Sequence, residues 1–293
     1  MSMINIFSVS DKKCIDTVYA LVNSIKHNKD KDTEVNYFLI IEDCDDEYTD
    51  YFNDLISNDF SIIFVNAREF ENQINPPDRS YLYYLRCLAP KIFKNLDKIL
   101  YLDTDVVAVS NRLEELWNTD INDVYLAGAI DIEEALRDEN ERINVGKNVP
   151  NNTYFNSGVL LFNLEKIRND GYDEKLCQYL LKYPEGLQCI LYDQTLLNWL
   201  FKDNVKIIST DFNNSILSMV VYDTTYYQAF YNTRNLLEKL ETACLLHFKG
   251  HKVWKPLVDS NQKKYLPNYT FGRIIYLNLY NQFSKKGIKK YEQ

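Results

Sequence analysis

Two carboxylates separated by one residue follow an apolar run near the middle of the chain. Asp103 and Asp105 come directly after the strand expected over residues 98–102. Side chains at positions i and i+2 of an extended segment point the same way, so together they can hold a hard divalent cation. Two further Asp pairs with this spacing, at positions 30 and 32 and at 43 and 45, lie in polar stretches. The alternative for Asp103 and Asp105 is an acidic turn that only ends a strand.

Two of the three histidines fall within a five-residue stretch late in the chain. His247 follows an apolar run, where its ring can provide the nitrogen ligand of Mn²⁺ or a similar ion. Gly250 lets the backbone approach a ligand closely, and Lys252 can reach a phosphate as a point charge. The alternative is a basic surface loop that is anchored by Trp254.

Polar side chains also interrupt three otherwise apolar segments. Asn156 lies inside an apolar strand, Asp193 and Gln194 stand at the start of a helix, and Arg86 is a charge on an apolar helical stretch. Each has an ordinary structural explanation as a turn, a helix cap, or an arginine whose stem packs while its head reaches water. These residues therefore become candidates for a site only together with the others.

The elements that must position these residues follow an alternating pattern in the first hundred residues. Near-continuous apolar runs over residues 4–9, 35–41, 61–65 and 98–102 are typical of parallel strands that are buried on both faces. Amphipathic stretches separate them, with helices expected over residues 11–26, 46–57 and 81–93. This β-α alternation predicts an open, mostly parallel α/β sheet, which binds ligands beyond the carboxyl ends of its strands.

The second half of the chain is more mixed. Residues 131–153 are polar and rich in Asn, which indicates a long loop. The remaining expected elements are a short apolar run at 106–109, strands at 124–130, 155–164 and 243–248, and helices at 172–181, 193–201 and 270–283. No linker divides the chain, so we expect one domain with a mixed, mostly parallel central sheet and helices on both faces.

Composition narrows the class of protein. The 293 residues carry a net charge of −9, although residues 245–293 contain ten Lys and Arg against two acids. An acidic chain offers no extended basic face, so we do not expect nucleic acid as a partner. The six cysteines include no pair with CxxC spacing, and no apolar run approaches the ~18 residues of a membrane span. With no basic leader at its start, we expect a reduced, cytoplasmic protein.

Four segments, taken in order, resemble glycosyltransferase family 8, which includes bacterial lipooligosaccharide galactosyl- and glucosyltransferases and glycogenin. They are YLDTDVV at 101–107, YFNSGVLLFNL at 154–164, YDQTLLNWLF at 192–201 and HFKGHKVWKP at 247–256. The resemblance implies a GT-A fold, a UDP-sugar donor such as UDP-glucose or UDP-galactose, Mn²⁺ or Mg²⁺, and retention of anomeric configuration. It implies a catalytic domain at residues 1–256 followed by an aromatic, basic helical tail at 257–293. The acceptor would be a glycan, glycolipid or glycoprotein.

The same resemblance assigns roles to individual residues. Asp103, Asp105 and His247 would bind the metal. The candidate donor contacts are Ser8, Ser10 and Asp11 at the uracil, Thr104 at the ribose, Gly250 and Lys252 at the diphosphate, and Arg86 and Asp131 at the sugar. The candidate catalytic residues are Asn156, Asp193 and Gln194, which would surround the transferred sugar. One departure is that residues 11–14, Asp-Lys-Lys-Cys, lack the aromatic residue with which many relatives stack on uracil.

The amide at position 194 bears on the mechanism. A double displacement needs a good nucleophile beneath the anomeric carbon, and the neutral amide of Gln194 is a poor one. We therefore favour attack by the acceptor hydroxyl on the face from which the leaving group departs. Asn156 and Gln194 would then position and polarise the reactants.

Three other readings of the motifs stay open at this point. Residues 103–107 also fit the DxDxV signature of haloacid dehalogenase phosphatases, although that motif usually stands near the start of the chain. A sugar nucleotidyltransferase would usually have a Gly-rich, basic first loop, and a silent sugar-nucleotide-binding protein needs no turnover at all. The basic tail could hold the chain at the inner membrane face, or its helix could pack on the catalytic domain.

Overall fold

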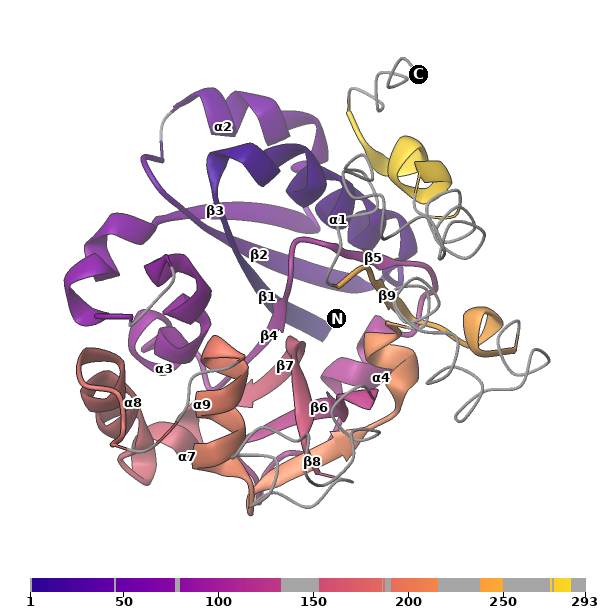
Figure 1. The fold of residues 1–293 in the computed structure, drawn as a ribbon. Helices are drawn as coiled ribbons and strands as arrows, with labels where there is room; N and C mark the ends of the chain where they lie inside the picture. The colour runs from indigo at the N-terminus through magenta and orange to yellow at the C-terminus, as the bar shows by residue number, and fades with distance from the viewer. Residues whose placement is uncertain are drawn as a thin grey trace, which may run out of the picture.

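Seven strands form one sheet in the part of the chain that the structure describes, a computed structural model (Figure 1). Their order across the sheet is β3-β2-β1-β4-β7-β6-β8. Strands β1 to β4 and the β6–β8 pair are parallel, whereas β7 runs antiparallel to both of its neighbours. The described residues are 2–44, 46–76, 80–132, 153–185, 187, 191–215, 238–249, 275 and 277–285.

The element bounds follow the chain in this order. The strands are β1 (Ser2–Ser10), β2 (Thr33–Ile41), β3 (Phe60–Asn66), β4 (Lys98–Leu102), β5 (Val106–Ala108), β6 (Leu126–Ile130), β7 (Phe155–Asn163), β8 (Val205–Ile208) and β9 (Leu245–His247). The α-helices are α1 (Ile15–Asn28), α2 (Asp46–Phe52), α3 (Ala89–Ile92), α4 (Leu113–Trp117), α7 (Leu164–Asn169), α8 (Tyr172–Leu181) and α9 (Tyr192–Phe201). The 3₁₀ helices are η1 (Lys12–Cys14), η2 (Asn53–Leu55), η3 (Ala67–Gln73), η4 (Tyr81–Leu88) and η5 (Thr210–Asn213).

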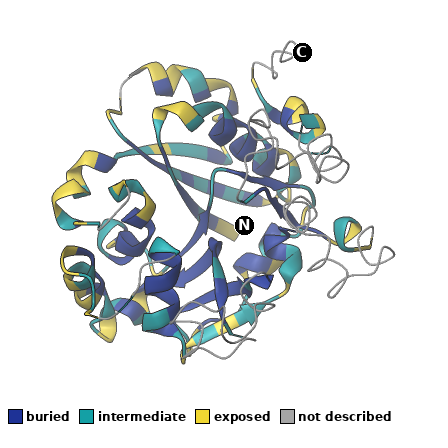
Figure 2. Cartoon of the chain, viewed as in Figure 1, coloured by how far each residue is buried: buried dark blue, intermediate teal, exposed yellow. Residues whose placement is uncertain are grey.

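Helices cover both faces of the sheet, and its inner strands are largely buried between them, whereas the edge strands β3 and β8 are mostly half-buried (Figure 2). Strand β1 shows why, because its alternate side chains enter different cores. Ile4 and Ile6 pack with α1, α2 and α4, whereas Phe7 packs with η4, α3, α7, α8 and α9. A strand with apolar residues on both sides can be stable only in such a middle layer. The predicted mixed, mostly parallel sheet with helices on both faces is confirmed.

The four apolar runs of the first hundred residues are β1, β2, β3 and β4, as predicted. Several details of the sequence-based assignment differ, and α4, η3 and η5 were not predicted. The stretch 81–93 is a 3₁₀ helix, η4, that continues into the short helix α3, and the helix expected over 46–57 ends at Phe52 and is followed by η2. The short edge strand β8 was not predicted. Its four residues, one of them Lys206, give too weak an alternation to be distinguished from a loop.

Strands β5 and β9 leave the main sheet and pair with each other as a two-stranded antiparallel ribbon. This ribbon lies next to α1, on the same side of the sheet as α2 (Figure 1). The pairing sets Val106 opposite His247. Residues that are 141 positions apart in the sequence are thereby brought side by side.

The described part of the C-terminal region packs on the rest of the chain. Residues 277–283 are helical, and Tyr280 and Phe283 are buried in a cluster with Ala20 and Val107. Asn23 of α1 donates a hydrogen bond to the backbone oxygen of Phe283 at 2.8 Å. This helix lies beside α1 in Figure 1. Most of the predicted tail, including 257–274 and 286–293, lies outside the described residues.

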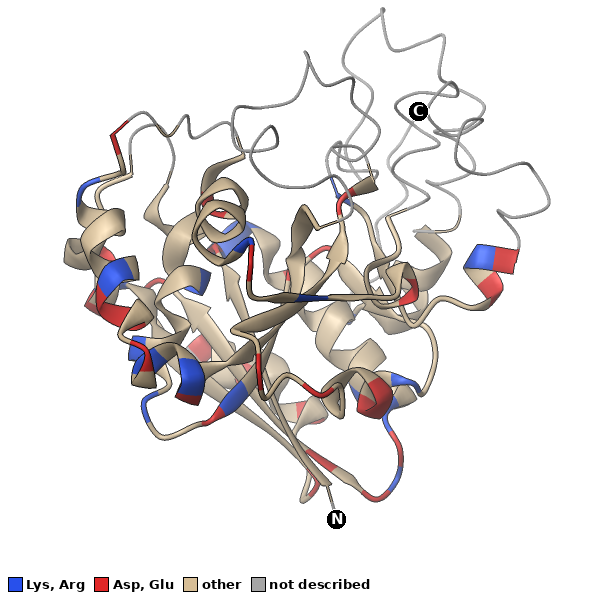
Figure 3. Cartoon of the chain, turned by 90° about the horizontal axis from the view of Figure 1, so that it is seen from below, with Lys and Arg blue, Asp and Glu red and all other residues tan. Residues whose placement is uncertain are grey.

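Charged residues of both signs are interspersed along the outer helices and loops (Figure 3). Ion pairs such as Lys29–Asp59 and Lys166–Asp170 join neighbouring elements or successive turns. Within the described segments, no helix is both long and apolar enough to cross a membrane.

Candidate functional site

The two carboxylates lie at the carboxyl end of β4, beside the end of β1. Asp103 directly follows β4, and its backbone N–H donates to the carbonyl of Gly158 on β7 at 2.8 Å. A turn closed by the bond from the N–H of Val106 to the carbonyl of Asp103 then leads into β5. Strand order changes direction between β1 and β4, which is where open α/β sheets form their ligand crevice. The predicted position for this pair is confirmed.

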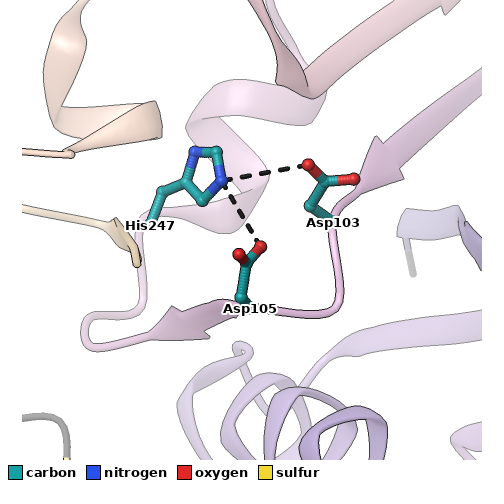
Figure 4. Close-up of side chains that lie close together, drawn as sticks. All are labelled: Asp103, Asp105 and His247. Carbon is teal, nitrogen blue, oxygen red and sulfur yellow. Dashed lines mark ion pairs between the residues drawn. The ribbon is translucent and has the colours of Figure 1, made fainter. Parts of the chain in front are cut away.

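The ribbon of β5 and β9 brings the histidine to the carboxylates. His247 is the last residue of β9, and the N–H of the next residue, Phe248, donates to the backbone oxygen of Asp105 at 3.0 Å. His247 Nε2 lies 3.4 Å from Asp105 Oδ1 and 3.9 Å from Asp103 Oδ2 (Figure 4). One ligand atom from each of the three residues lies within 4.8 Å of the others.

These donors suit a divalent cation. Two carboxylate oxygens and one imidazole nitrogen form a mixed set that Mn²⁺ accepts, and Mg²⁺ favours the oxygens. Asp105 and His247 are buried, so their mutual arrangement is fixed by the surrounding chain rather than by solvent. The three residues could therefore hold a metal ion.

The imidazole of His247 rests directly on the backbone of β7. A Cβ placed on Gly158 would lie 2.9 Å from His247 Nδ1, 3.1 Å from Asn156 Oδ1, and closer still to His247 Cε1. Real carbon contacts are about 3.5–4.0 Å. Only glycine leaves room for the ring here, which gives a steric reason for the glycine inside this apolar strand.

A chain of side-chain amides joins the histidine to the neighbouring helix. Asn213 Oδ1 lies 2.8 Å from His247 Nδ1, and Asn213 Nδ2 donates to Asn156 Oδ1 at 2.9 Å. Asn156 Nδ2 in turn donates to Gln194 Oε1 at 3.1 Å and to Asp131 Oδ2 at 3.0 Å. The network runs from η5 through β7 to α9, so a displacement of one amide would be passed to the others.

Helix α9 is held in register against β7 by two amides one turn apart. Asn198 accepts from the N–H of Phe155 and donates to its carbonyl, at 2.9 and 2.8 Å. Gln194 Oε1 accepts from the N–H of Ser157 at 3.0 Å. Residues i and i+4 lie on the same face of a helix, which is why both reach the strand. One N–H of the Gln194 amide also donates to Asp131 Oδ2 at 3.1 Å. The oxygen and one N–H of this amide are therefore hydrogen-bonded within the protein.

Arg86 connects several residues of the site through ion pairs and a hydrogen bond. It lies within η4 and is only 6% exposed, so it does not extend to water as its ordinary explanation would have it. Its guanidinium lies 3.0 Å from Asp103 Oδ1 and 3.2 Å from Asp193 Oδ2, and it donates to the carbonyl of Ser157 at 2.9 Å. Burial alone would lower the pKa of Arg86, but the charges of Asp103 and Asp193 hold it above its ordinary value.

Two further carboxyls have opposite electrostatic environments. Burial raises the pKa of Asp193 to about 6, even though Arg86 opposes this shift. Burial would also raise the pKa of Asp131, but the charge of Lys249 and hydrogen bonds from Asn156 and Gln194 lower it to about 2. Asp193 is the second residue of α9, whose N-cap is Leu191, so the alternative that it caps the helix is wrong.

A cavity of about 360 Å³ lies at this end of the sheet. It brings together eleven charged or polar residues of interest: Ser10, Asp11, Arg86, Asp103, Thr104, Asp105, Asn156, Asp193, Gln194, His247 and Lys249. Ten of these were predicted from the sequence. A volume of this size suits a small-molecule ligand such as a nucleotide.

Other predicted residues lie elsewhere. Ser8 is buried inside the sheet, where it donates to the carbonyl of Leu102 at 2.6 Å and accepts from Tyr37, so it is not among the cavity-lining residues. Asp131 is not among the cavity-lining residues, but its carboxylate accepts hydrogen bonds from the cavity residues Asn156 and Gln194. Gly250 and Lys252 lie outside the described residues.

Three residues of the site were missed in the sequence. Asn198 could have been found, because it stands four positions after Gln194 on the same helix. Lys249, which lies 3.2 Å from Asp131, is within the histidine-containing motif and could also have been considered. Asn213 has no comparable signal, since it lies in a short polar turn 34 positions before the histidine that it contacts.

A family model for glycosyl transferase family 8 matches residues 5–257. The chain belongs to glycosyl transferase family 8. The resemblance found in the motifs is thereby confirmed, and the phosphatase alternative is not favoured.

Curated relatives agree with the family assignment. A putative glycosyltransferase of Haemophilus influenzae is 29% identical over 199 residues, covering 67% of this chain and 59% of the relative. GlyA, a glycosyltransferase of Streptococcus pneumoniae, is 29% identical over 254 residues, covering 85% of this chain and 32% of the relative. A lipopolysaccharide 1,2-glucosyltransferase of Escherichia coli is 26% identical over 303 residues, covering 98% and 82%. The chain thus spans about a third to four fifths of the length of these relatives.

Solved structures support the fold. The bifunctional glycosyltransferase WbbM matches with a TM-score of 0.70 at 16% identity, covering 95% of this chain and 52% of that one. The galactosyltransferase LgtC, in complex with donor and acceptor sugar analogues, matches with a TM-score of 0.60 at 20% identity, covering 92% and 96%. The predicted GT-A fold is confirmed by these neighbours and by the sheet described above.

Proposed function

We propose that this family 8 glycosyltransferase moves a hexose from a UDP-sugar to a glycan, glycolipid or glycoprotein acceptor, with retention of configuration and dependence on Mn²⁺. The observation that carries the proposal is the cluster of Asp103, Asp105 and His247 at the edge of a cavity of nucleotide size. One oxygen from each carboxylate and one imidazole nitrogen lie within 4.8 Å of one another, and this mixed donor set suits a divalent cation such as Mn²⁺.

A divalent cation bound by these three residues would neutralise charge on the departing diphosphate. The chain's own residues would do the rest. Arg86 fixes the orientation of Asp103 through their ion pair and stacks on the ring of Tyr101 at 4.3 Å. Thr104 and Ser10 line the cavity next to this site and would contact the nucleoside. Gly250 and Lys252 stay predicted contacts of the diphosphate.

The amide network supports a positioning role for the three candidate catalytic residues. Asn156 uses both N–H groups and both lone pairs of its oxygen within the protein, so it positions Gln194, whose amide keeps one N–H beside the cavity. Asp193 is paired with Arg86 and buried, which makes it a poor covalent nucleophile. These contacts favour attack by the acceptor hydroxyl on the same face as the leaving group, with the leaving phosphate as the group that accepts its proton.

The choice of sugar rests on the relatives. One is named a 1,2-glucosyltransferase and one structural neighbour is a galactosyltransferase. We therefore propose glucose or galactose as the transferred sugar.

We further propose that residues 1–256 form the catalytic domain and 257–293 a tail. The burial of Tyr280 and Phe283 supports a tail that packs on that domain. We propose residues 286–293 as candidates for contact with the cytoplasmic face of the inner membrane.

The test is UDP release over a panel of UDP-sugars, measured with Mn²⁺ and with EDTA. We expect release from one UDP-hexose, abolished by EDTA and by Asp105→Ala. A matched control is Asp59→Ala, because Asp59 also forms an ion pair but lies far from the cavity on the loop before β3. Release that survives both EDTA and Asp105→Ala would contradict the proposal. Binding of a UDP-sugar without any release would identify a silent binding protein instead.

A further inference from the structure

Asn213 makes a contact that the proposed chemistry does not yet use. It is the last residue of η5, and its side chain is buried at 5% exposure. The segment that carries it is tied to β9 on both sides, since the N–H of Cys244 donates to Asp211 and the N–H of His247 donates to Asn214. Asn213 is therefore held beside the imidazole by the backbone, and its Oδ1 lies 2.8 Å from Nδ1 of His247.

The direction of each hydrogen bond in this chain follows from one backbone group. The N–H of Gly158 lies 3.0 Å from Asn156 Oδ1 and can only donate, so that side-chain atom is an oxygen. The Asn213 atom that lies 2.9 Å from this oxygen must then be its NH₂ group. The remaining atom of the Asn213 amide is its oxygen, and it faces His247 Nδ1. Because that oxygen can only accept, Nδ1 must carry the proton.

We propose that Asn213 is a positioning residue that keeps a proton on Nδ1 of His247, so that Nε2 is the nitrogen left to bind a cation together with the two carboxylates. In a neutral imidazole only one nitrogen is protonated, so a proton fixed on Nδ1 leaves Nε2 as the acceptor. Metal-binding histidines commonly have their other nitrogen fixed by such a bond. This inference rests on the proposed function, since it assigns that function's cation to Nε2.

The first test reads the tautomer without any substitution at Asn213. The full chain is labelled with ¹⁵N-histidine, and ring nitrogen shifts are recorded at pH 8 without metal. The chain has three histidines, and the signal of His247 is assigned by its loss in His247→Gln. We expect a proton-bearing Nδ1 and a proton-free Nε2. A ring that carries its proton on Nε2 and none on Nδ1 would overturn the inference.

The second test measures the consequence for the metal. Mn²⁺ alone is titrated into each variant, and the free ion is followed by electron paramagnetic resonance. Asn213→Leu keeps the side-chain size but removes the acceptor, and we expect it to weaken Mn²⁺ binding about 10–100-fold. Asn213→Asp keeps an oxygen beside Nδ1 but loses the donor to Asn156 Oδ1, so we expect it to recover part of that loss.

A matched control separates this role from simple loss of a buried amide. Asn214→Leu removes the adjacent buried amide, whose side chain donates to the carbonyl of Lys239 at 2.8 Å. We expect this variant to bind Mn²⁺ within about threefold of the wild type. Equal affinity for wild type and Asn213→Leu, or equal losses for the Leu and Asp variants at position 213, would overturn the inference. Neither test uses a sugar nucleotide, so activity that persists in EDTA would contradict the proposed function separately.

Discussion

Replacement of Gly158 by alanine tests how closely the metal site is built onto strand β7. The added methyl group would lie 2.9 Å from His247 Nδ1 and closer still to Cε1. The backbone at this position is not among the glycines with positive φ, so alanine causes no conformational strain of its own. The effect should therefore come from the contact with the imidazole, with a smaller part from the 3.1 Å contact with Asn156 Oδ1.

The size of that effect follows from the distances. An ordinary carbon contact needs about 3.5–4.0 Å, so the ring must move by roughly 1 Å to accept the methyl group. His247 is buried and held by Asn213, so such a shift takes Nε2 away from the two carboxylates. Displacements of about 1 Å at a reacting centre cost about 100-fold in rate, and overpacking costs about 1–3 kcal/mol of stability.

The assay combines urea unfolding, Mn²⁺ titration and UDP release. For Gly158→Ala we expect a folded protein whose Mn²⁺ affinity and turnover both fall at least tenfold. Gly128→Ala is the matched control, because its added Cβ would meet the flexible end of Leu160 at 3.0 Å, away from the site. It should lose similar stability but keep its Mn²⁺ affinity. A folded Gly158→Ala with wild-type metal affinity would refute the reasoning.

Three further predictions concern other parts of the site and the tail. Arg86→Met leaves Asp103 and Asp193 without their shared cation in a buried setting, so urea unfolding should show a loss of about 3–5 kcal/mol. Asp131 has a pKa lowered to about 2, so its contribution of ~2 kcal/mol is present above pH 4 and is lost as the pH falls toward 2. This is measured as the pH dependence of the stability difference between wild type and Asp131→Asn. Phe283→Ala should destabilise the whole domain by about 3 kcal/mol in urea, because the ring is buried against it.

Each of these has a result that would contradict it. If Arg86→Met has the same free energy of unfolding as the wild type, Asp103 and Asp193 are not held by an ion pair with Arg86. A stability difference for Asp131→Asn that is the same at pH 7 and pH 3 would mean that Asp131 is not selectively stabilised as the anion. If Phe283→Ala unfolds like the wild type, the C-terminal helix is not packed on α1 in solution.

The sheet was predictable because parallel strands need continuous apolar runs. Residues 35–41 and 98–102 have such runs and form β2 and β4. β5 has the same apolar character, yet it pairs with β9 rather than joining the main sheet. Its partner is more than 130 residues away, and nothing local in either segment specifies that pairing. The 3₁₀ geometry of η4 was also hidden, since its apolar spacing fits an α-helix equally well.

The site residues within the motifs could be predicted from the sequence, whereas the residues that hold them in place could not. Asp103, Asp105 and His247 each follow an apolar strand, where the pattern points to a ligand. The family resemblance assigned Ser8 to the uracil together with Ser10 and Asp11. It lies two residues before the end of β1, where its hydroxyl donates to the carbonyl of Leu102 and accepts from Tyr37 instead of lining the cavity. Asn213 acts through a contact that only the folded chain creates, and a single asparagine in a polar turn carries no periodicity.

The late position of β9 has a consequence for how the protein matures. Among the described residues, every strand of the main sheet ends by Ile208, well before His247 in the chain. During synthesis the sheet can therefore assemble while its cation site still lacks the nitrogen ligand, and the two acids would face each other without it. Binding of a cation by all three proposed ligands would then report that synthesis has passed residue 247 and that the ribbon has closed. By mass action it would also stabilise that closed state, by about 2.7 kcal/mol at a free concentration of 100 Kd.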